Sequence, residues 1–196
     1  MGFWGTYVVL RSDEPPAQML PAIRTLQGAV SRGGPWSAGW RVWIVHDPAG
    51  SLPDDLLEQL HAVIGAPVLL GRVLDSDAVH VVAAGTSAQP WSVWLQLDSA
   101  MGFLLPPPAP FDDDGNYLGD DWRDPAYEAQ VELTRGEILA QAPGGMAGAR
   151  SAQAWARDAG LTPDTVEAIT SVLDGHETFA EDLFLLLLQR LGLNPA

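Results

Sequence analysis

The chain of 196 residues contains no cysteine and no lysine, so all ten of its cations are arginines. The absence of cysteine excludes disulfides, thiolate nucleophiles and cysteine-ligated zinc or iron–sulfur centres. Long hydrophobic runs are also missing: the longest, 183–188, has six residues, whereas a membrane-spanning helix needs ~20. The N-terminal segment lacks the basic stretch followed by an apolar one that marks a secretory signal. We therefore expect a cytoplasmic protein with no membrane association.

Positive charge is scarce, since 25 Asp and Glu against ten Arg give a formal net charge of −15. A surface this acidic repels phosphates and anionic lipids, which excludes non-specific binding to nucleic acids or to membranes. Hydrophobic residues nevertheless make up 47% of the chain and charged residues only 18%, which favours a packed core over disorder. The use of Arg in place of Lys, with 20 Gly and 16 Pro, is typical of proteins from GC-rich bacteria.

The sequence predicts an α+β fold: a five-stranded mixed sheet with two crossover helices, plus a C-terminal helical subdomain packed on it. Within a domain over 1–105, apolar runs bounded by turn residues indicate strands at 7–10, 40–46, 67–74, 78–84 and 91–97. Amphipathic segments at 16–30 and 51–64 indicate helices between the first three strands. Strand–helix–strand units favour parallel pairing, whereas the last three strands indicate an antiparallel meander.

Two further zones follow: a connection rich in Pro and Asp over 106–124, and the helical subdomain over 125–196. Helix starts are indicated at Pro125, Ser151 and Pro163, and at a capping box formed by Thr178 and Glu181. The last helix, 179–191, is apolar on most sides, which is typical of a buried helix. We expect it to pack the subdomain on the sheet; the alternative is a helix that binds a partner.

Residues 151–192 also resemble the helix–turn–helix segment of bacterial repressors. The resemblance rests on 155–166, where the sequence Ala-Gly-Leu-Thr at 159–162 matches the turn before a recognition helix. The family would imply DNA reading, but neither Arg nor Lys occurs from Asp158 to Gln189. Recognition helices need cations for the phosphate backbone, so the sequence predicts this geometry without DNA binding.

Acidic residues are concentrated in the connection, with aspartates at Asp112, Asp113, Asp114, Asp120 and Asp121. Long-range attraction between such a cluster and a positive surface raises association rates. This predicts a non-catalytic protein-binding module, such as an immunity-like protein or a regulatory adaptor, that recognises the basic surface of a partner protein.

A second interpretation of the same loop is a calcium-stabilised domain. The residues Asp112, Asp114, Asn116 and Asp121 follow the spacing of ligand positions in an EF-hand loop when Gly115 is set at its glycine position. The first ligand position of that pattern falls on Pro110, which has no side-chain oxygen. No other cofactor is predicted.

The eight tryptophans suggest a third function, a small-molecule site or an enzyme active site. Strand alternation groups Trp43 with Arg41 and separates Trp94 from its apolar neighbours. A sheet face that carries Trp43, Trp94, Arg41, His80 and Gln96 would suit a ligand with a flat apolar body and polar edges. The other interpretation is that the C-terminal helices cover this face and that the tryptophans are core residues, each with its indole N–H bonded to a backbone acceptor. Nucleophile-elbow, zinc-binding and phosphate-loop motifs do not occur, so no catalytic residue is predicted.

Overall fold

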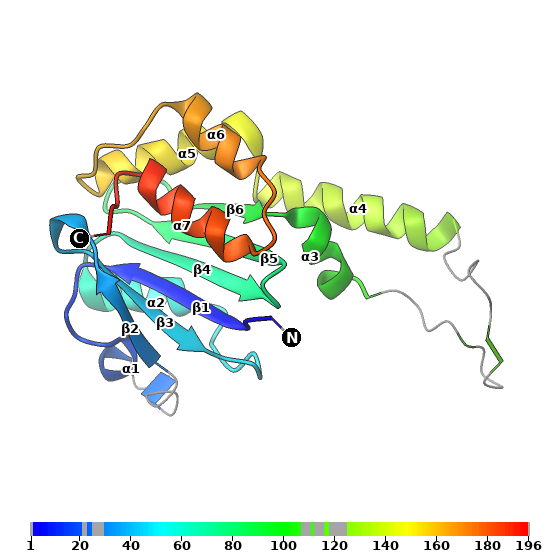
Figure 1. Cartoon of the computed structure of the whole chain (residues 1–196), viewed down its shortest axis with the longest axis horizontal. Coiled ribbons are helices and arrows are strands. Elements are labelled where there is room, and N and C mark those ends of the chain that lie inside the picture. The colour runs from blue at the N-terminus through cyan, green and yellow to red at the C-terminus, as the bar shows by residue number, and fades with distance from the viewer. Residues whose placement is uncertain are drawn as a thin grey trace.

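The computed structural model describes residues 2–20, 23–24, 30–106, 111, 116–117 and 125–195, with side chains described except at 30–35 and 38. Its strands are β1 (Gly5–Leu10), β2 (Val30–Pro35), β3 (Arg41–His46), β4 (Val68–Leu74), β5 (Ala78–Ala84) and β6 (Trp91–Leu95). Its helices are α1 (Pro16–Met19), α2 (Leu56–Ile64), α3 (Leu97–Leu104), α4 (Pro125–Gln141), α5 (Gly145–Asp158), α6 (Val166–Leu173) and α7 (Ala180–Arg190). The fold is α+β, as the sequence predicts, with helices on both faces of one sheet (Figure 1).

The sheet has six strands in the order β2-β3-β1-β4-β5-β6, and each neighbouring pair is antiparallel. The prediction of five strands in a mixed sheet was therefore wrong in both the number and the pairing. Because β1 lies between β3 and β4, the crossover through α2 joins two strands that run in the same direction but are not neighbours. The connection through α1 joins β1 and β2 in the same way, with β3 between them. Both crossover connections therefore join strands that run in the same direction, although all hydrogen-bonded neighbours in this sheet are antiparallel.

The helix predicted over 16–30 was wrong after its first turn. Helix α1 ends at Met19, and Leu20 has an extended conformation with φ −115° and ψ 114°. Leu20 precedes Pro21, and the residue before a proline is disfavoured from the helical region. The chain then returns as β2, where Val30 pairs with Val45. The 3-10 turn η2 (Ser37–Gly39) closes the β2–β3 hairpin.

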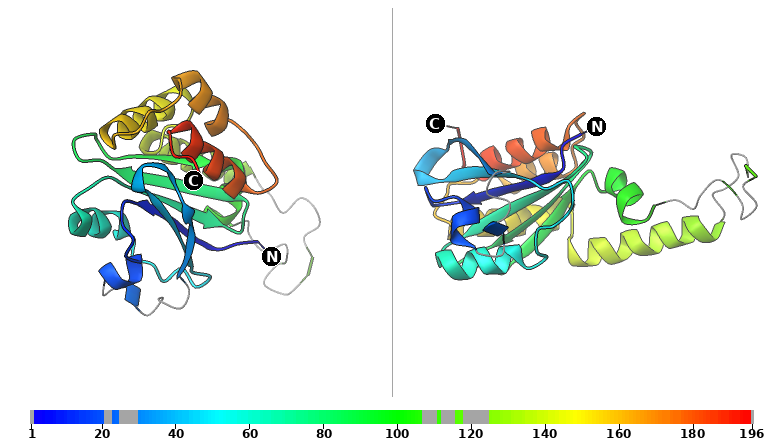
Figure 2. Two further views of the ribbon diagram at one scale, coloured as in Figure 1. Left: turned by 60° about the vertical axis from the view of Figure 1, so that its left-hand side comes forward. Right: turned by 90° about the horizontal axis from the view of Figure 1, so that it is seen from below.

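Each face of the sheet contributes to its own hydrophobic core, because successive strand residues point to opposite sides. We call the side covered by α5, α6 and α7 the α7 face, and the side covered by α1 and α2 the α2 face (Figure 2). On β1, Val9 belongs to the α7 face, whereas Val8 and Leu10 belong to the α2 face. Trp155 and Phe184 are fully buried on the α7 face. The predicted packing of the C-terminal helices on the sheet is confirmed for α5, α6 and α7, but not for α4, which has no buried residue.

Three of the predicted helix starts were wrong in position. Ser151 lies inside α5, where its hydroxyl donates a hydrogen bond to the Ala147 carbonyl. Helix α6 begins after Thr165, whose side chain accepts a hydrogen bond from the backbone N–H of Ala168. The N-cap of α7 is Phe179, not the predicted Thr178, and it makes no side-chain cap. The predicted capping residue Glu181 instead accepts a hydrogen bond from Ser76, which ties α7 to the β4–β5 turn.

Helices α3 and α4, which we call the arm, extend away from the sheet (Figures 1 and 2). Helix α3 was not predicted; it begins because Gln96, with φ +58°, turns the chain sharply after β6. The two helices are joined by a hydrogen bond from the Tyr127 hydroxyl to the Leu105 carbonyl and by an ion pair between Arg135 and Asp98. None of the 17 residues of α4 is buried. No helix in the described ranges has the length and apolar character that a bilayer crossing requires.

Candidate functional site

A row of polar and aromatic side chains crosses four strands on the α2 face. Thr6 of β1 pairs with Arg72 of β4, Arg72 pairs with His80 of β5, and His80 pairs with Trp94 of β6. Directly paired residues of antiparallel strands point to the same face, so these side chains form one continuous row. His80 and Trp94 are only partly buried, whereas Val81 and Val93 beside them on the α7 face are fully buried. Thr6 at the other end of the row is buried, so the row is only partly covered at its β5 and β6 end.

The rings of His80 and Trp94 stack, with centroids 4.4 Å apart and planes inclined by 10°. Burial, followed by the charge of Arg72, lowers the pKa of His80 to about 4. The imidazole is therefore uncharged at neutral pH. The pair presents a neutral aromatic surface at the β6 edge of the sheet.

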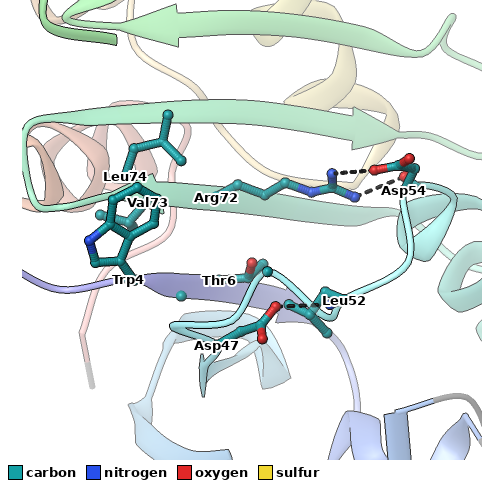
Figure 3. Close-up of a pocket in the computed structure, with 10 residues that line it drawn as sticks. Trp4, Thr6, Asp47, Leu52, Asp54, Arg72, Val73 and Leu74 are labelled. Carbon is teal, nitrogen blue, oxygen red and sulfur yellow. Dashed lines mark hydrogen bonds and ion pairs between the residues drawn. The ribbon is translucent and has the colours of Figure 1, made fainter. Parts of the chain in front are cut away.

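Arg72 holds the loop that leads into α2. Its Nη2 donates hydrogen bonds to the carbonyl oxygens of Pro53, at 3.0 Å, and Asp54, at 2.8 Å. Figure 3 shows the contact of Arg72 with Asp54. Beside it lies a pocket of about 170 Å³ whose lining includes Trp4, Thr6 and Leu52. Pockets for small organic ligands usually have volumes of about 300–1,000 Å³. This pocket is smaller, and Arg72 fixes one of its walls.

Asp47, at the edge of the same pocket, organises the loop after β3. Its carboxylate accepts hydrogen bonds from the backbone N–H and hydroxyl of Ser51 and from the backbone N–H of Leu52. Burial alone would raise the pKa of Asp47, but these hydrogen bonds and the nearby His46 outweigh it and hold the pKa below its usual value. Asp47 is thus an ionised, fully engaged loop anchor.

Replacing Asp47 by alanine is expected to lower the free energy of unfolding by about 2 kcal/mol, because three donors lose a charged acceptor. Since the folded pKa lies below the unfolded one, this stabilisation is present above about pH 4 and is lost as the pH falls below it. Urea denaturation at pH 7 measures the loss. The exposed Glu58 is the matched control, for which Glu58→Ala should cost under about 0.5 kcal/mol. Equal losses in the two variants would contradict the anchoring role.

A larger cleft, of about 550 Å³, lies at the root of the arm. Its walls come from the end of β6 and the start of α3, from α4, and from the loop between α6 and α7. The polar side chains among its lining residues are Trp94, Gln96, Asp98, Ser99, Arg135, Asp174 and His176. The amide of Gln96 joins the end of β6 to two other segments: it donates a hydrogen bond to the Asp77 carbonyl in the β4–β5 turn and accepts one from the backbone N–H of Glu177 in the α6–α7 loop. Two walls of the cleft, the end of β6 and the α6–α7 loop, are therefore fixed to each other, and the arm contributes a further wall.

The structure separates the five residues of the predicted ligand-binding face into two groups. His80 and Trp94 stack, and Trp94 and Gln96 both line the cleft. Trp43 points to the same face as Trp94, but β1, β4 and β5 lie between their strands. At ~4.8 Å per strand, the two strands are about 19 Å apart. Trp43 is 5% exposed in the core under α1 and α2.

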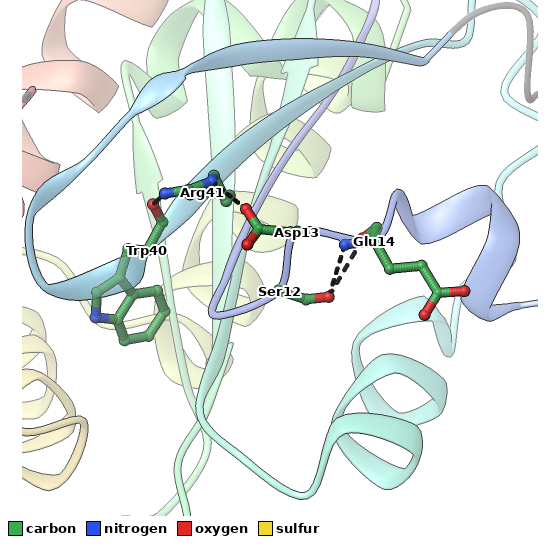
Figure 4. A network of polar contacts seen from close by, with 5 residues as sticks. All are labelled: Ser12, Asp13, Glu14, Trp40 and Arg41. Carbon is green, nitrogen blue, oxygen red and sulfur yellow. Dashed lines mark hydrogen bonds and ion pairs between the residues drawn. The ribbon is translucent and has the colours of Figure 1, made fainter.

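Arg41, the fifth of these residues, is engaged in a local network. Its Nε donates a hydrogen bond to Asp13 at 2.8 Å, and its Nη1 donates one to the carbonyl of Trp40 at 3.1 Å (Figure 4). This network fixes the segment after β1 to the start of β3. The interpretation of tryptophans as core residues holds for a set in which each side chain is buried: Trp36, Trp40, Trp43, Trp91 and Trp155. The helices that cover Trp43 are α1 and α2, not the predicted C-terminal helices. The predicted backbone acceptor is found for the indole N–H of Trp155, which donates to the Ala84 carbonyl at 2.9 Å.

The acidic residues of the connection lie outside the described residues, namely Asp112, Asp113, Asp114, Asp120 and Asp121. Of the predicted calcium ligands only Asn116 is described, and it is exposed. Among the described residues, no three His, Asp or Glu side chains gather in an arrangement that could hold a metal ion. Calcium binding by this loop stays a prediction.

Sequence reasoning missed Arg72, Asp98, Arg135 and Asp174. Arg72 could have been found, because the hairpin between the strands predicted at 67–74 and 78–84 places residue 72 opposite His80. Arg135 and Asp174 come from two distant helical segments, and no local pattern indicates that they share a cleft. The resulting set of an aromatic ring, carboxylates and a guanidinium suits recognition by stacking and charge.

Comparison of the chain with protein-family models, with curated proteins and with solved structures found no match.

Proposed function

We propose that the protein is a non-catalytic binding module whose arm docks on the basic surface of a partner protein. The observation that carries this proposal is the exposure of apolar side chains on the arm. Six of the nine large apolar side chains that are exposed among the described residues lie on the arm or between its helices: Phe103, Leu104, Phe111, Tyr117, Leu133 and Leu139. Concentrated apolar exposure on an otherwise well-packed protein is typical of an interaction surface.

The charge of the arm indicates what kind of partner fits. Helices α3 and α4 carry Asp98, Glu128, Glu132 and Glu137 but a single cation, Arg135. That cation already pairs with Asp98 and Glu132, so the arm presents apolar and negative groups together. A second copy of a chain with a net charge of −15 would be repelled. A basic protein surface with exposed apolar groups complements the arm in both respects.

Site-specific photocross-linking tests the proposal directly. A benzoylphenylalanine placed at Leu133, which is 57% exposed on α4, is expected to capture a basic protein in a lysate of the native host. The same probe at Val63, which is 58% exposed on α2, is the matched control and should not capture that protein. Identical products at the two positions, or an acidic product at Leu133, would contradict docking through the arm.

Charge reversal on the arm tests the proposal quantitatively. The association rate of each variant with the purified partner is measured. The variant Glu128→Lys/Glu137→Lys should slow association at low ionic strength by about tenfold, and added salt should reduce the difference. The control Glu14→Lys/Glu58→Lys makes the same change of net charge at exposed sites outside the arm. If both variants slow association equally, net charge rather than the arm controls binding.

A further inference from the structure

We infer that the cleft at the root of the arm receives an arginine side chain of the basic partner. This inference rests on the proposed function and names the group that the partner places there. The cleft borders the arm through Arg135 and Leu139, so a protein bound along α4 lies next to its mouth. The volume of about 550 Å³ is ample for an arginine side chain together with the backbone that carries it.

The charges around the cleft favour a cation. Asp98 and Asp174 contribute carboxylates, and Arg135 is the one cation among the residues that line the cleft. Arg135 is held by Asp98 and is also 3.5 Å from Glu132, so the charges of Asp98 and Arg135 offset each other and Asp174 supplies the remaining carboxylate of the cleft. Asp174 is exposed, and it takes part in none of the ion pairs found among the residues that the structure describes. It leaves a carboxylate available on the wall opposite the arm.

Trp94 supplies a surface on which a flat cation can stack. A guanidinium over an indole ring is stabilised by the ring quadrupole, and it retains donors at its edge for a carboxylate. His80, stacked on the same indole, is uncharged at neutral pH because its pKa is about 4. It therefore does not repel an incoming cation. Arginine is favoured over lysine because only a guanidinium is planar and can bind a carboxylate through two parallel hydrogen bonds.

The test uses the whole chain labelled with ¹⁵N and two matched probes. N-acetylarginine amide carries the guanidinium, and N-acetylcitrulline amide has nearly the same shape without the charge. The indole N–H resonance of Trp94, assigned by its loss in Trp94→Phe, is followed during titration. We expect a saturable shift with the arginine probe, with a Kd of about 1 mM for a ligand of this size. The citrulline probe should produce no saturable shift.

Variants locate the site of binding. Asp174→Asn should weaken binding of the arginine probe about tenfold, because a charge-assisted pair is lost. Glu58→Gln removes one exposed carboxylate on α2 and should leave the Kd unchanged. The same two variants are then compared in the cross-linking experiment at Leu133, where Asp174→Asn should lower the yield and Glu58→Gln should not.

Each result decides a different point. Equal binding of the two probes, or an unchanged Kd in Asp174→Asn, would overturn the arginine site while capture of the partner at Leu133 could still succeed. Binding of the arginine probe without any basic partner captured at Leu133 would instead overturn docking and assign the cleft to a free guanidinium compound. Capture with a yield that does not depend on Asp174 would show that the partner binds the arm without entering the cleft.

Discussion

Replacing Phe184 by alanine is expected to lower the free energy of unfolding by about 4 kcal/mol, which is the cost of removing a fully buried aromatic ring and leaving a cavity. Phe184 has no exposed surface. Its ring lies 5.2 Å from that of Tyr7 and covers Gly71 of β4, so it joins α7 to the centre of the sheet. Single domains are stabilised by about 5–15 kcal/mol in total, so this one contact is a large part of what holds α7 in place.

Urea denaturation followed by circular dichroism measures this loss, and Phe179 provides the matched control. Phe179 precedes α7 and is 54% exposed, so Phe179→Ala should cost under about 0.5 kcal/mol. A second check uses Gly71, where an added methyl group would lie 2.5 Å from the Phe184 ring. Gly71→Ala alone should therefore destabilise, but the double variant with Phe184→Ala should lose less than the sum, because the methyl group occupies the vacated space. Strict additivity would show that the ring and Gly71 are not in contact.

The parts of the fold that depend on local pattern could be predicted from the sequence. Alternation along β5 and β6 correctly places His80 and Trp94 on a common face, because the side-chain direction in a strand is fixed by the backbone. The apolar helix at 179–191 correctly predicts a buried α7. The short turn at 75–77 even determines the β4–β5 register, and with it the pairing of Arg72 and His80.

The parts that depend on tertiary context were missed. The apolar positions at Leu20, Ile23 and Val30 fit a helical stripe, but Pro21 ends the helix and Val30 pairs in β2 instead. The strand–helix–strand order of β3, α2 and β4 is typical of two neighbouring parallel strands. In the structure, however, β1 lies between β3 and β4. Which strand inserts there depends on pairing across the whole sheet, and no window of sequence contains that information.

The candidate cleft shows the same division between local and distant information. Trp94 and Gln96 were predicted as binding residues from one strand, but their partners Arg135 and Asp174 lie about 40 and 80 residues further along the chain. Gln96 itself adopts φ +58°, a left-handed conformation that non-glycine residues seldom adopt and that no pattern around it indicates. The arm exists because of that turn, and the cleft exists because the arm returns beside the α6–α7 loop.

The stability of the protein is expected to fall between pH 6.5 and pH 4 partly through His80, and His80→Phe should remove that part. An unfolded histidine has a pKa of about 6.5, whereas burial and the charge of Arg72 lower the pKa of His80 to about 4 in the folded protein. Below pH 6.5 the unfolded chain therefore binds a proton that the folded chain does not. From pH 7.5 to pH 4.5 this linkage costs the folded state about 2 kcal/mol, and below the folded pKa the cost no longer grows.

Urea denaturation of the wild type and of His80→Phe at pH 7.5, 6.0 and 4.5 isolates this contribution. Phenylalanine keeps a ring against Trp94 but cannot be protonated, so the carboxylates that also titrate at low pH affect both proteins equally. The difference between the two unfolding free energies should change by about 2 kcal/mol in favour of the variant as the pH falls to 4.5. His176 is exposed, and His176→Phe should follow the wild type. A difference that does not change with pH would mean that burial and the charge of Arg72 do not oppose protonation of His80.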